Sequence, residues 1–168
     1  DINSLDVLEK NNIRNVEVSG SLKFDRVKYQ LTLNNKVEKI DKLLKSNREK
    51  WFVFYMHHNL FKTNSPWLDI HITKNYKEIV NFLSAHENFK IHISGHVHQY
   101  SINHINSSHF YTIPATSAQF KKNTKEFTLD QIQPGYCVLE INEDGSHKMK
   151  VIRVKGFFGE PDKNPKTY

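Results

Sequence analysis

Residues 51–58 (Trp-Phe-Val-Phe-Tyr-Met-His-His) and residues 91–98 (Ile-His-Ile-Ser-Gly-His-Val-His) share one pattern, an expected strand that is followed by a pair of histidines. The run from Trp51 to Met56 is rich in aromatics and too short for a buried helix, which predicts a strand covered on both faces. The segment Lys90–Ser94 predicts a second strand. Binding sites in an open α/β sheet gather at the carboxyl ends of strands. We therefore expect both histidine pairs to face one crevice.

The rest of the chain alternates between helical and strand patterns. The expected elements are a helix at 3–11, strands at 13–18 and 27–33, helices at 36–47 and 75–86, and strands at 109–113, 135–142 and 147–154. Asn34 and Asn35 are expected to cap the helix at 36–47. The last two strands flank an Asp-Gly turn and predict a hairpin. This mixed order predicts an α/β sandwich with helices packed on sheets.

Length and composition exclude several classes of protein. With 168 residues, 38% of them apolar, the chain predicts about one folded domain and excludes wholesale disorder. No apolar run approaches the roughly 20 residues of a membrane-spanning helix, so we expect no membrane partner. The lone Cys137 excludes a disulfide framework and fits a reducing, cytoplasmic setting. The net charge of +6 is spread over both flanks without a basic block, so we expect no nucleic-acid partner.

Histidines are concentrated in the middle of the chain. Residues 51–120 carry nine of the ten histidines but only four Lys or Arg and three Asp or Glu. Alternate residues of an extended backbone point the same way, so His96 and His98 are expected to reach into one site. With His57 from the neighbouring strand they form a plausible metal shell, because neutral imidazole binds Zn, Mn, Fe and Ni. A single histidine at a strand end is more often structural, but the three together favour metal.

The other histidines have different expected places. His92, between apolar neighbours, is expected to be partly buried and hydrogen-bonded. The remaining five are expected at the surface: His71, His86, His104, His109 and His147. Of these, His71 is the expected exception, because it lies near the site. Cys137 alternates with apolar residues in a strand and is expected in the core.

These residues together resemble the calcineurin-like metallophosphoesterases, in the second half of their catalytic domain. His57-His58 after a strand and the later Gly95-His96-Val97-His98 look like the last two metal-binding motifs of that family, in the right order. The likeness is greatest to bacterial class III cyclic-nucleotide phosphodiesterases and covers residues 36–155. The segments similar to that subgroup are Pro66 to Asp69, Asn75, Gly95 to Gln99, Pro114 to Phe120, Phe127 to Asp130 and Gln133 to Tyr136.

The resemblance implies a four-layer α/β/β/α sandwich, incomplete here at the N-terminus, and two divalent metal ions (Mn, Fe or Zn). By analogy, His57 and His96 would bind one ion and His98 the other. His58 would contact the phosphate or position its neighbours. The implied reaction is hydrolysis of a cyclic nucleotide such as cAMP by attack of a metal-bound water. Residues 1–155 would be the C-terminal portion of that domain and 156–168 an irregular tail.

One departure from the family pattern is large. The first half of the family domain supplies an Asp-x-His, a Gly-Asp and an Asn-His motif, and the only Asp-x-His here is Asp69-Ile70-His71, after the fourth motif. Without a bridging carboxylate, the histidines alone would hold two cations poorly. We therefore expect this polypeptide by itself to be inactive or weakly active, and its exposed sheet faces to favour a homo-oligomer.

Two other functions remain open. One is a different phosphoesterase of the same superfamily, a phosphomonoesterase or a nucleotide-sugar hydrolase. The other is a non-catalytic module that binds metal or a partner protein. The subgroup-like segments favour the cyclic-nucleotide diesterase over the first of these.

Overall fold

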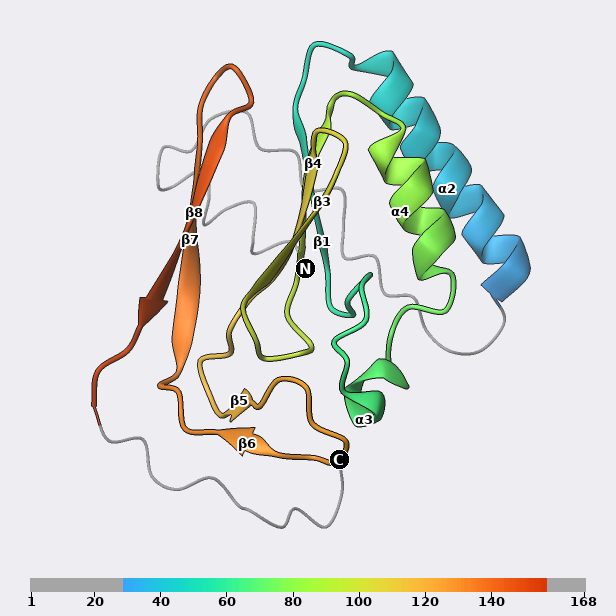
Figure 1. Ribbon diagram of the computed structural model, residues 1–168. Coiled ribbons are helices and arrows are strands. Elements are labelled where there is room, and N and C mark those ends of the chain that lie inside the picture. Colours follow the sequence, from blue (N-terminus) through green and yellow to red (C-terminus); the bar gives the residue numbers. More distant parts are fainter. Residues whose placement is uncertain (1–28, 157–168) are drawn as a thin grey trace, which may run out of the picture.

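The structure is a computed structural model that describes residues 29–156, with side chains described from residue 37 onward. Its elements in chain order are α2 (Tyr29–Ser46), β1 (Phe52–Met56), α3 (Pro66–Asp69), α4 (Tyr76–Ser84), β2 (Phe89–Ser94), β3 (Ser101–Ile105), β4 (Ser108–Thr112), β5 (Gln119–Phe120), β6 (Leu129–Asp130), β7 (Gly135–Ile141) and β8 (His147–Arg153). Two long helices, a four-stranded sheet and a hairpin form three layers, with α3, β5 and β6 gathered at one end (Figure 1). None of the described helices is long and apolar enough to cross a bilayer.

The four-stranded sheet has the order β1-β2-β4-β3. Strands β1, β2 and β4 run parallel, and β3 pairs antiparallel with β4. The register sets Met56, the last residue of β1, opposite Ser94, the last residue of β2. Because both strands end at the same level, the two histidine motifs leave the sheet side by side, as their sequence predicted.

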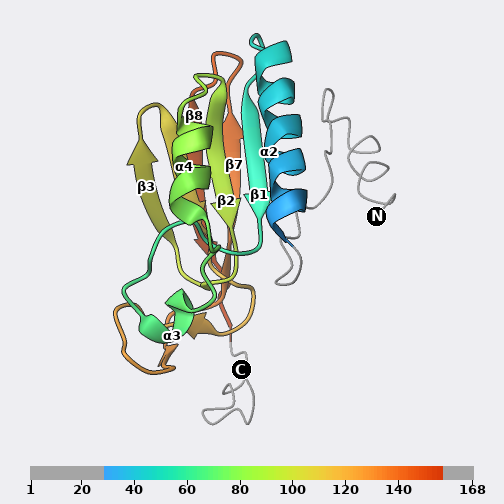
Figure 2. The same cartoon turned by 90° about the vertical axis from the view of Figure 1, so that its right-hand side faces the viewer.

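The helices cover one face of this sheet (Figure 2). Leu44 of α2 and Leu83 of α4 pack against three aromatic rings, Phe54, Phe89 and Phe110, and all five side chains are buried. Each fully buried side chain of this size contributes about 1.5–3 kcal/mol relative to an exposed one. This cluster is the main core, and it fixes the strands that carry the site.

The hairpin β7–β8 covers the opposite face. Leu139 and Met149 pack against a second buried cluster formed by Ile91, Ile93 and Tyr111. The predicted α/β sandwich is therefore confirmed, and the residues described supply an α/β/β arrangement. Cys137 of β7, expected in the core, is only half buried.

The strand predicted at 27–33 is wrong for residues 29–33, which begin helix α2. The predictions at 3–11 and 13–18 lie outside the described residues. Leu33, Val37, Ile40 and Leu44 are also spaced as one face of a helix. Extending an existing helix adds one hydrogen bond per residue without a second nucleation cost. The helix therefore runs through Asn34 and Asn35, the residues expected to cap it.

Two further expectations need correction. Strand β1 is not covered on both faces, because Tyr55 is 63% exposed. Among the described residues it is also an edge strand of its sheet. Four short elements, α3, β3, β5 and β6, had no clear sequence pattern. The helix at 75–86, the strands at 90–94 and 109–113 and the hairpin are confirmed within one or two residues at each end.

Candidate functional site

The main chain at the ends of β1 and β2 brings the two histidine motifs together. The backbone N–H groups of Gly95 and His96 both donate to the carbonyl oxygen of His57, at 3.2 and 3.0 Å. The imidazole of His96 is then surrounded by three others. Its ring centroid lies 5.0 Å from that of His57, 4.5 Å from that of His58 and 5.4 Å from that of His71. Four imidazoles therefore meet at the carboxyl end of the sheet.

Two of these rings face each other through their nitrogens. Nε2 of His57 lies 3.2 Å from Nδ1 of His96, so one nitrogen donates a hydrogen bond that the other accepts. Two nitrogens bound at about 2.1 Å to one tetrahedral ion would lie about 3.4 Å apart. The pair as it stands therefore has nearly the spacing of two ligands of one metal ion.

The environment of His96 favours the neutral imidazole. Burial, followed by the neighbouring His58, His57, His71 and His98, lowers the pKa of His96 to about 4. Its Nε2 is buried and has no hydrogen-bond partner among the residues described. A neutral imidazole is suited to metal binding, because the neutral form of histidine is the ligand form.

His98 does not lie on an extended backbone, so the argument that it points the same way as His96 is wrong. Gly95 to His98 form a tight turn in which the N–H of His98 donates to the carbonyl of Gly95 at 3.1 Å, and His98 has a φ of 47°. Its ring stacks on Phe120, with centroids 4.3 Å apart and planes 6° apart. Its Nδ1 donates to the carbonyl of Ala118 at 2.9 Å. Burial lowers the pKa of His98, while the hydrogen bond to Ala118 opposes that shift.

The remaining histidines divide between this cluster and other places. His71 lies in the segment that follows α3 and belongs to the cluster. Its place in the sequence predicts it near the site, unlike the other surface histidines. His92 is fully and not partly buried, at 1% exposed, and its Nε2 has no hydrogen-bond partner among the residues described. The reason is that β2 is an interior strand whose helix-facing side lies under α2 and α4. The rings of His104 and His147 lie 4.3 and 4.4 Å from that of His109, a second cluster between the sheet and the hairpin.

The imidazoles fit part of a metal centre. The spacing of Nε2 of His57 and Nδ1 of His96 suits two ligands of one divalent transition-metal ion. Within residues 29–156, however, no group of three His, Cys, Asp or Glu side chains is arranged to hold an ion by itself. Asp69 accepts hydrogen bonds from the backbone and side chain of Thr63, both at 2.8 Å. The described residues therefore offer imidazole ligands without a bridging carboxylate.

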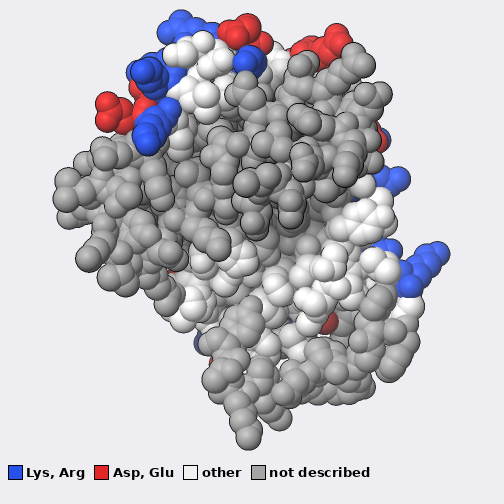
Figure 3. Space-filling model, turned by 180° about the vertical axis from the view of Figure 1, so that it is seen from behind, with Lys and Arg blue, Asp and Glu red and all other residues white. Residues whose placement is uncertain are grey.

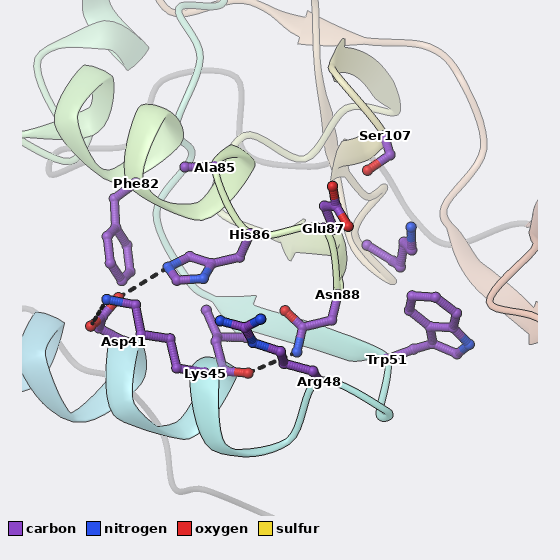
Figure 4. Close-up of a pocket in the computed structure, with 12 residues that line it drawn as sticks. Asp41, Lys45, Arg48, Trp51, Phe82, Ala85, His86, Glu87, Asn88 and Ser107 are labelled. Atoms are coloured by element: carbon purple, nitrogen blue, oxygen red, sulfur yellow. Dashed lines mark hydrogen bonds and ion pairs between the residues drawn. The ribbon is translucent and has the colours of Figure 1, made fainter.

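A cavity of about 950 Å³ lies elsewhere, between the C-terminal ends of α2 and α4 (Figure 4). Asp41 pairs there with Lys45 at 2.8 Å and with His86 at 3.2 Å. None of the clustered histidines lines this cavity. This cavity is therefore separate from the histidine site. On the face shown in Figure 3, some Lys and Arg side chains lie near Asp and Glu at the top and others lie at the right-hand edge, without a continuous basic track among the residues described.

Comparison with known proteins adds independent evidence. No protein-family model matches the chain. The 3',5'-cyclic adenosine monophosphate phosphodiesterase CpdA of Haemophilus influenzae is 34% identical over 121 residues, which are 72% of this chain and 44% of the relative. CpdA of Escherichia coli K12 is 30% identical over 132 residues, 79% of this chain and 48% of the relative. The chain thus spans about half the length of these curated relatives or less.

A solved structure supports the fold alone. GAP50, the anchor in the inner membrane complex of Plasmodium, matches with a TM-score of 0.50 and 16% identity over 77% of this chain and 41% of that protein. At this identity the likeness shows the arrangement of helices and strands and carries no information on function.

Proposed function

We propose that this chain, which belongs to the family of CpdA-type phosphodiesterases among the calcineurin-like metallophosphoesterases, forms part of a centre that hydrolyses a cyclic-nucleotide phosphodiester. The observation that carries the proposal is the contact between His57 and His96, at the ends of two parallel strands, in a chain similar to cAMP phosphodiesterases over 72% of its length. The expected substrate is a small cyclic nucleotide of the cAMP type.

The histidines have separate roles in this proposal. His57 and His96 would hold one divalent ion, and His98 would hold a second through Nε2, the nitrogen that its bond to Ala118 leaves unprotonated. His58, whose ring lies 4.5 Å from that of His96, would hydrogen-bond the phosphate or orient its neighbours. When bound, Mn, Fe or Zn ions supply charge stabilisation for an in-line displacement at phosphorus. The low pKa of His96 keeps that ring available as a neutral ligand at pH 7.

The chain by itself is proposed to turn over weakly or not at all. A dinuclear centre needs ligands that bridge two cations, and imidazole, with one free lone pair, cannot bridge them as a carboxylate does. The described residues bring no third acidic or imidazole ligand into place beside His57 and His96. Activity therefore requires further ligands from outside the described residues.

The test is an assay of the 168-residue chain and of the full-length gene product, each with Mn²⁺ and with Fe²⁺. The substrates are cAMP, bis(p-nitrophenyl) phosphate and p-nitrophenyl phosphate. We expect the full-length product to hydrolyse cAMP and the chain alone to bind metal with little turnover. Preference for the monoester would favour a phosphomonoesterase. Stoichiometric metal without turnover in either protein would favour a non-catalytic metal-binding module.

A further inference from the structure

The orientation of His98 is set from outside its own motif. Its imidazole lies flat against Phe120, with centroids 4.3 Å apart and planes 6° apart. Its Nδ1 lies 2.9 Å from the carbonyl oxygen of Ala118. Both partners come from β5 and the residue before it, about 20 positions further along the chain. The turn from Gly95 to His98 only places the imidazole of His98 next to this segment.

The hydrogen bond fixes which nitrogen of His98 carries the proton. A carbonyl oxygen can only accept, so Nδ1 must donate, and in the neutral ring Nε2 must then hold the lone pair. Stacking on Phe120 restricts rotation of the same ring about its Cβ–Cγ bond. Together the two contacts select one tautomer and one plane, which is what a metal ligand requires of its outer partners.

The platform under His98 is itself rigid. Phe120 is 3% exposed, and its ring lies edge-on to that of Trp67, 5.1 Å away, and to that of Phe127, 5.6 Å away. Trp67 is held in turn by its indole N–H, which donates to the hydroxyl of Thr124 at 3.1 Å. These rings belong to a small cluster that also includes the buried Leu68 and Val97. The plane of Phe120 is therefore fixed by packing on its other sides.

We propose that Phe120, together with the Ala118 carbonyl, is a positioning element that holds His98 as the Nδ1–H tautomer with Nε2 directed away as the ligand nitrogen. The inference rests on the proposed function only in assigning His98 to a metal. Phe120 does not touch substrate in this proposal and acts through His98 alone. The geometry of the second ion's site thus depends on the β5 segment, because Phe120 in β5 orients His98.

The first test needs no variant. Long-range ¹H–¹⁵N NMR of the 168-residue chain labelled with ¹⁵N-histidine, in metal-free buffer, reports which nitrogen of each neutral ring is protonated. The signals of His98 are assigned by their loss in His98→Gln. We expect protonated Nδ1 and unprotonated Nε2. A protonated Nε2, or rapid averaging of both tautomers, would overturn the proposal.

The second test removes the aromatic ring of Phe120 that stacks on His98. Phe120→Leu and Phe120→Met keep an apolar side chain, and Phe61→Leu is the control because Phe61 packs on Phe110 in the main core. We expect both Phe120 variants to broaden or average the His98 signals and, in the full-length gene product, to weaken binding of the second Zn²⁺ ion about 10-fold or more. The control should leave both unchanged. Unaltered His98 signals in a folded Phe120 variant would refute the positioning role.

The outcomes separate this inference from the proposed function. If the chain binds no Zn²⁺ but His98 shows the expected tautomer and loses it in Phe120→Met, the positioning role stands and the metal assignment fails. If cAMP is hydrolysed by the full-length product while His98 is protonated at Nε2, the proposed function stands and the positioning role fails.

Discussion

Nε2 of His57 lies 3.2 Å from Nδ1 of His96, although the two residues are 39 positions apart in the sequence. The parallel register of β1 and β2 produces this contact, because Met56 and Ser94 are paired and each is followed within two residues by a histidine. The contact is thus a property of the sheet and not of either loop alone.

Loss of either ring of this pair should weaken metal binding. We expect His57→Gln and His96→Gln each to reduce Zn²⁺ affinity by more than the roughly 10–100-fold typical of lost outer partners, because a ligand itself is removed. The control is His104→Gln, a change at an exposed histidine of β3. Isothermal titration calorimetry of the 168-residue chain measures all three. Equal affinity in the wild type and His96→Gln would place the metal elsewhere.

The sequence predicted the location of the site because its signal is local. A strand pattern followed by histidines defines both the strand and the residues at its carboxyl end, and two such segments predict neighbouring strands. His57 and His96 could therefore be assigned to one place before their contact was known. The main helix–sheet core was predictable for the same reason, since α4 and β2 have regular apolar spacing.

The orientation of His98 could not be predicted because it depends on a distant segment. The left-handed φ of His98 and its stacking on Phe120 arise from a turn and a two-residue strand that leave no periodic pattern. The start of α2 was missed for a different reason. Its first residues fit an alternating and a helical spacing equally, and only continuity with the following helix decides between them.

The tip of the β7–β8 hairpin should not tolerate a side chain at Gly145. Its φ is +80°, and an added Cβ would lie 2.6 Å from the ring of Trp51, whose indole N–H donates to the carbonyl of Glu143 at 3.0 Å. We expect Gly145→Ala to lower the free energy of unfolding by about 1–3 kcal/mol through strain and overpacking. Urea denaturation followed by tryptophan fluorescence measures the change.

Gly95→Ala is the matched control for this prediction. A Cβ at Gly95 would meet no atom within 4 Å, apart from its own chain neighbours. The same substitution should therefore leave the free energy of unfolding within about 0.5 kcal/mol of the wild type. A similar loss in both variants would show that the contact with Trp51 is not the cause.

Buried histidines should make the fold sensitive to acid. Burial lowers the pKa of His92 to about 3, and burial together with neighbouring histidines lowers the pKa of His109 and His147. The unfolded chain, with histidine pKa values of about 6.5, binds more protons than the folded chain below that pH. The stability from these neutral rings is thus complete above about pH 6.5 and is lost as pH falls below it.

His92→Leu tests the largest of these shifts. The variant cannot take up the proton on unfolding, so the slope of unfolding free energy against pH should fall by about 1.4 kcal/mol per pH unit between about pH 4 and 6. At pH 7 the two proteins should differ by less than about 1.5 kcal/mol, because the side chains have similar volumes. Urea titrations at several pH values in metal-free buffer give the slopes. Parallel curves would mean that His92 is not neutral in the folded state.

The end of α2 depends on the amide of Asn88. This buried side chain donates through Nδ2 to the carbonyl oxygens of Leu44 and Asn47, at 2.9 and 3.0 Å. Asn88→Asp keeps the shape but directs a carboxylate, which can only accept, at two acceptors near the negative end of a helix dipole. We expect a loss of roughly 2–4 kcal/mol in unfolding free energy at pH 7.

The pH dependence of that loss identifies its cause. Burial and the facing carbonyls should raise the pKa of the introduced carboxyl above its unfolded value, and once protonated it can donate one of the lost hydrogen bonds. The deficit of Asn88→Asp relative to the wild type should therefore shrink as the pH falls from 7 towards 4. Asn81→Asp, at an exposed position of α4, adds the same charge without burying it and should cost less than about 1 kcal/mol. A deficit that is equally large at pH 4 and pH 7 would mean that altered packing, and not the two facing carbonyls, destabilises the variant.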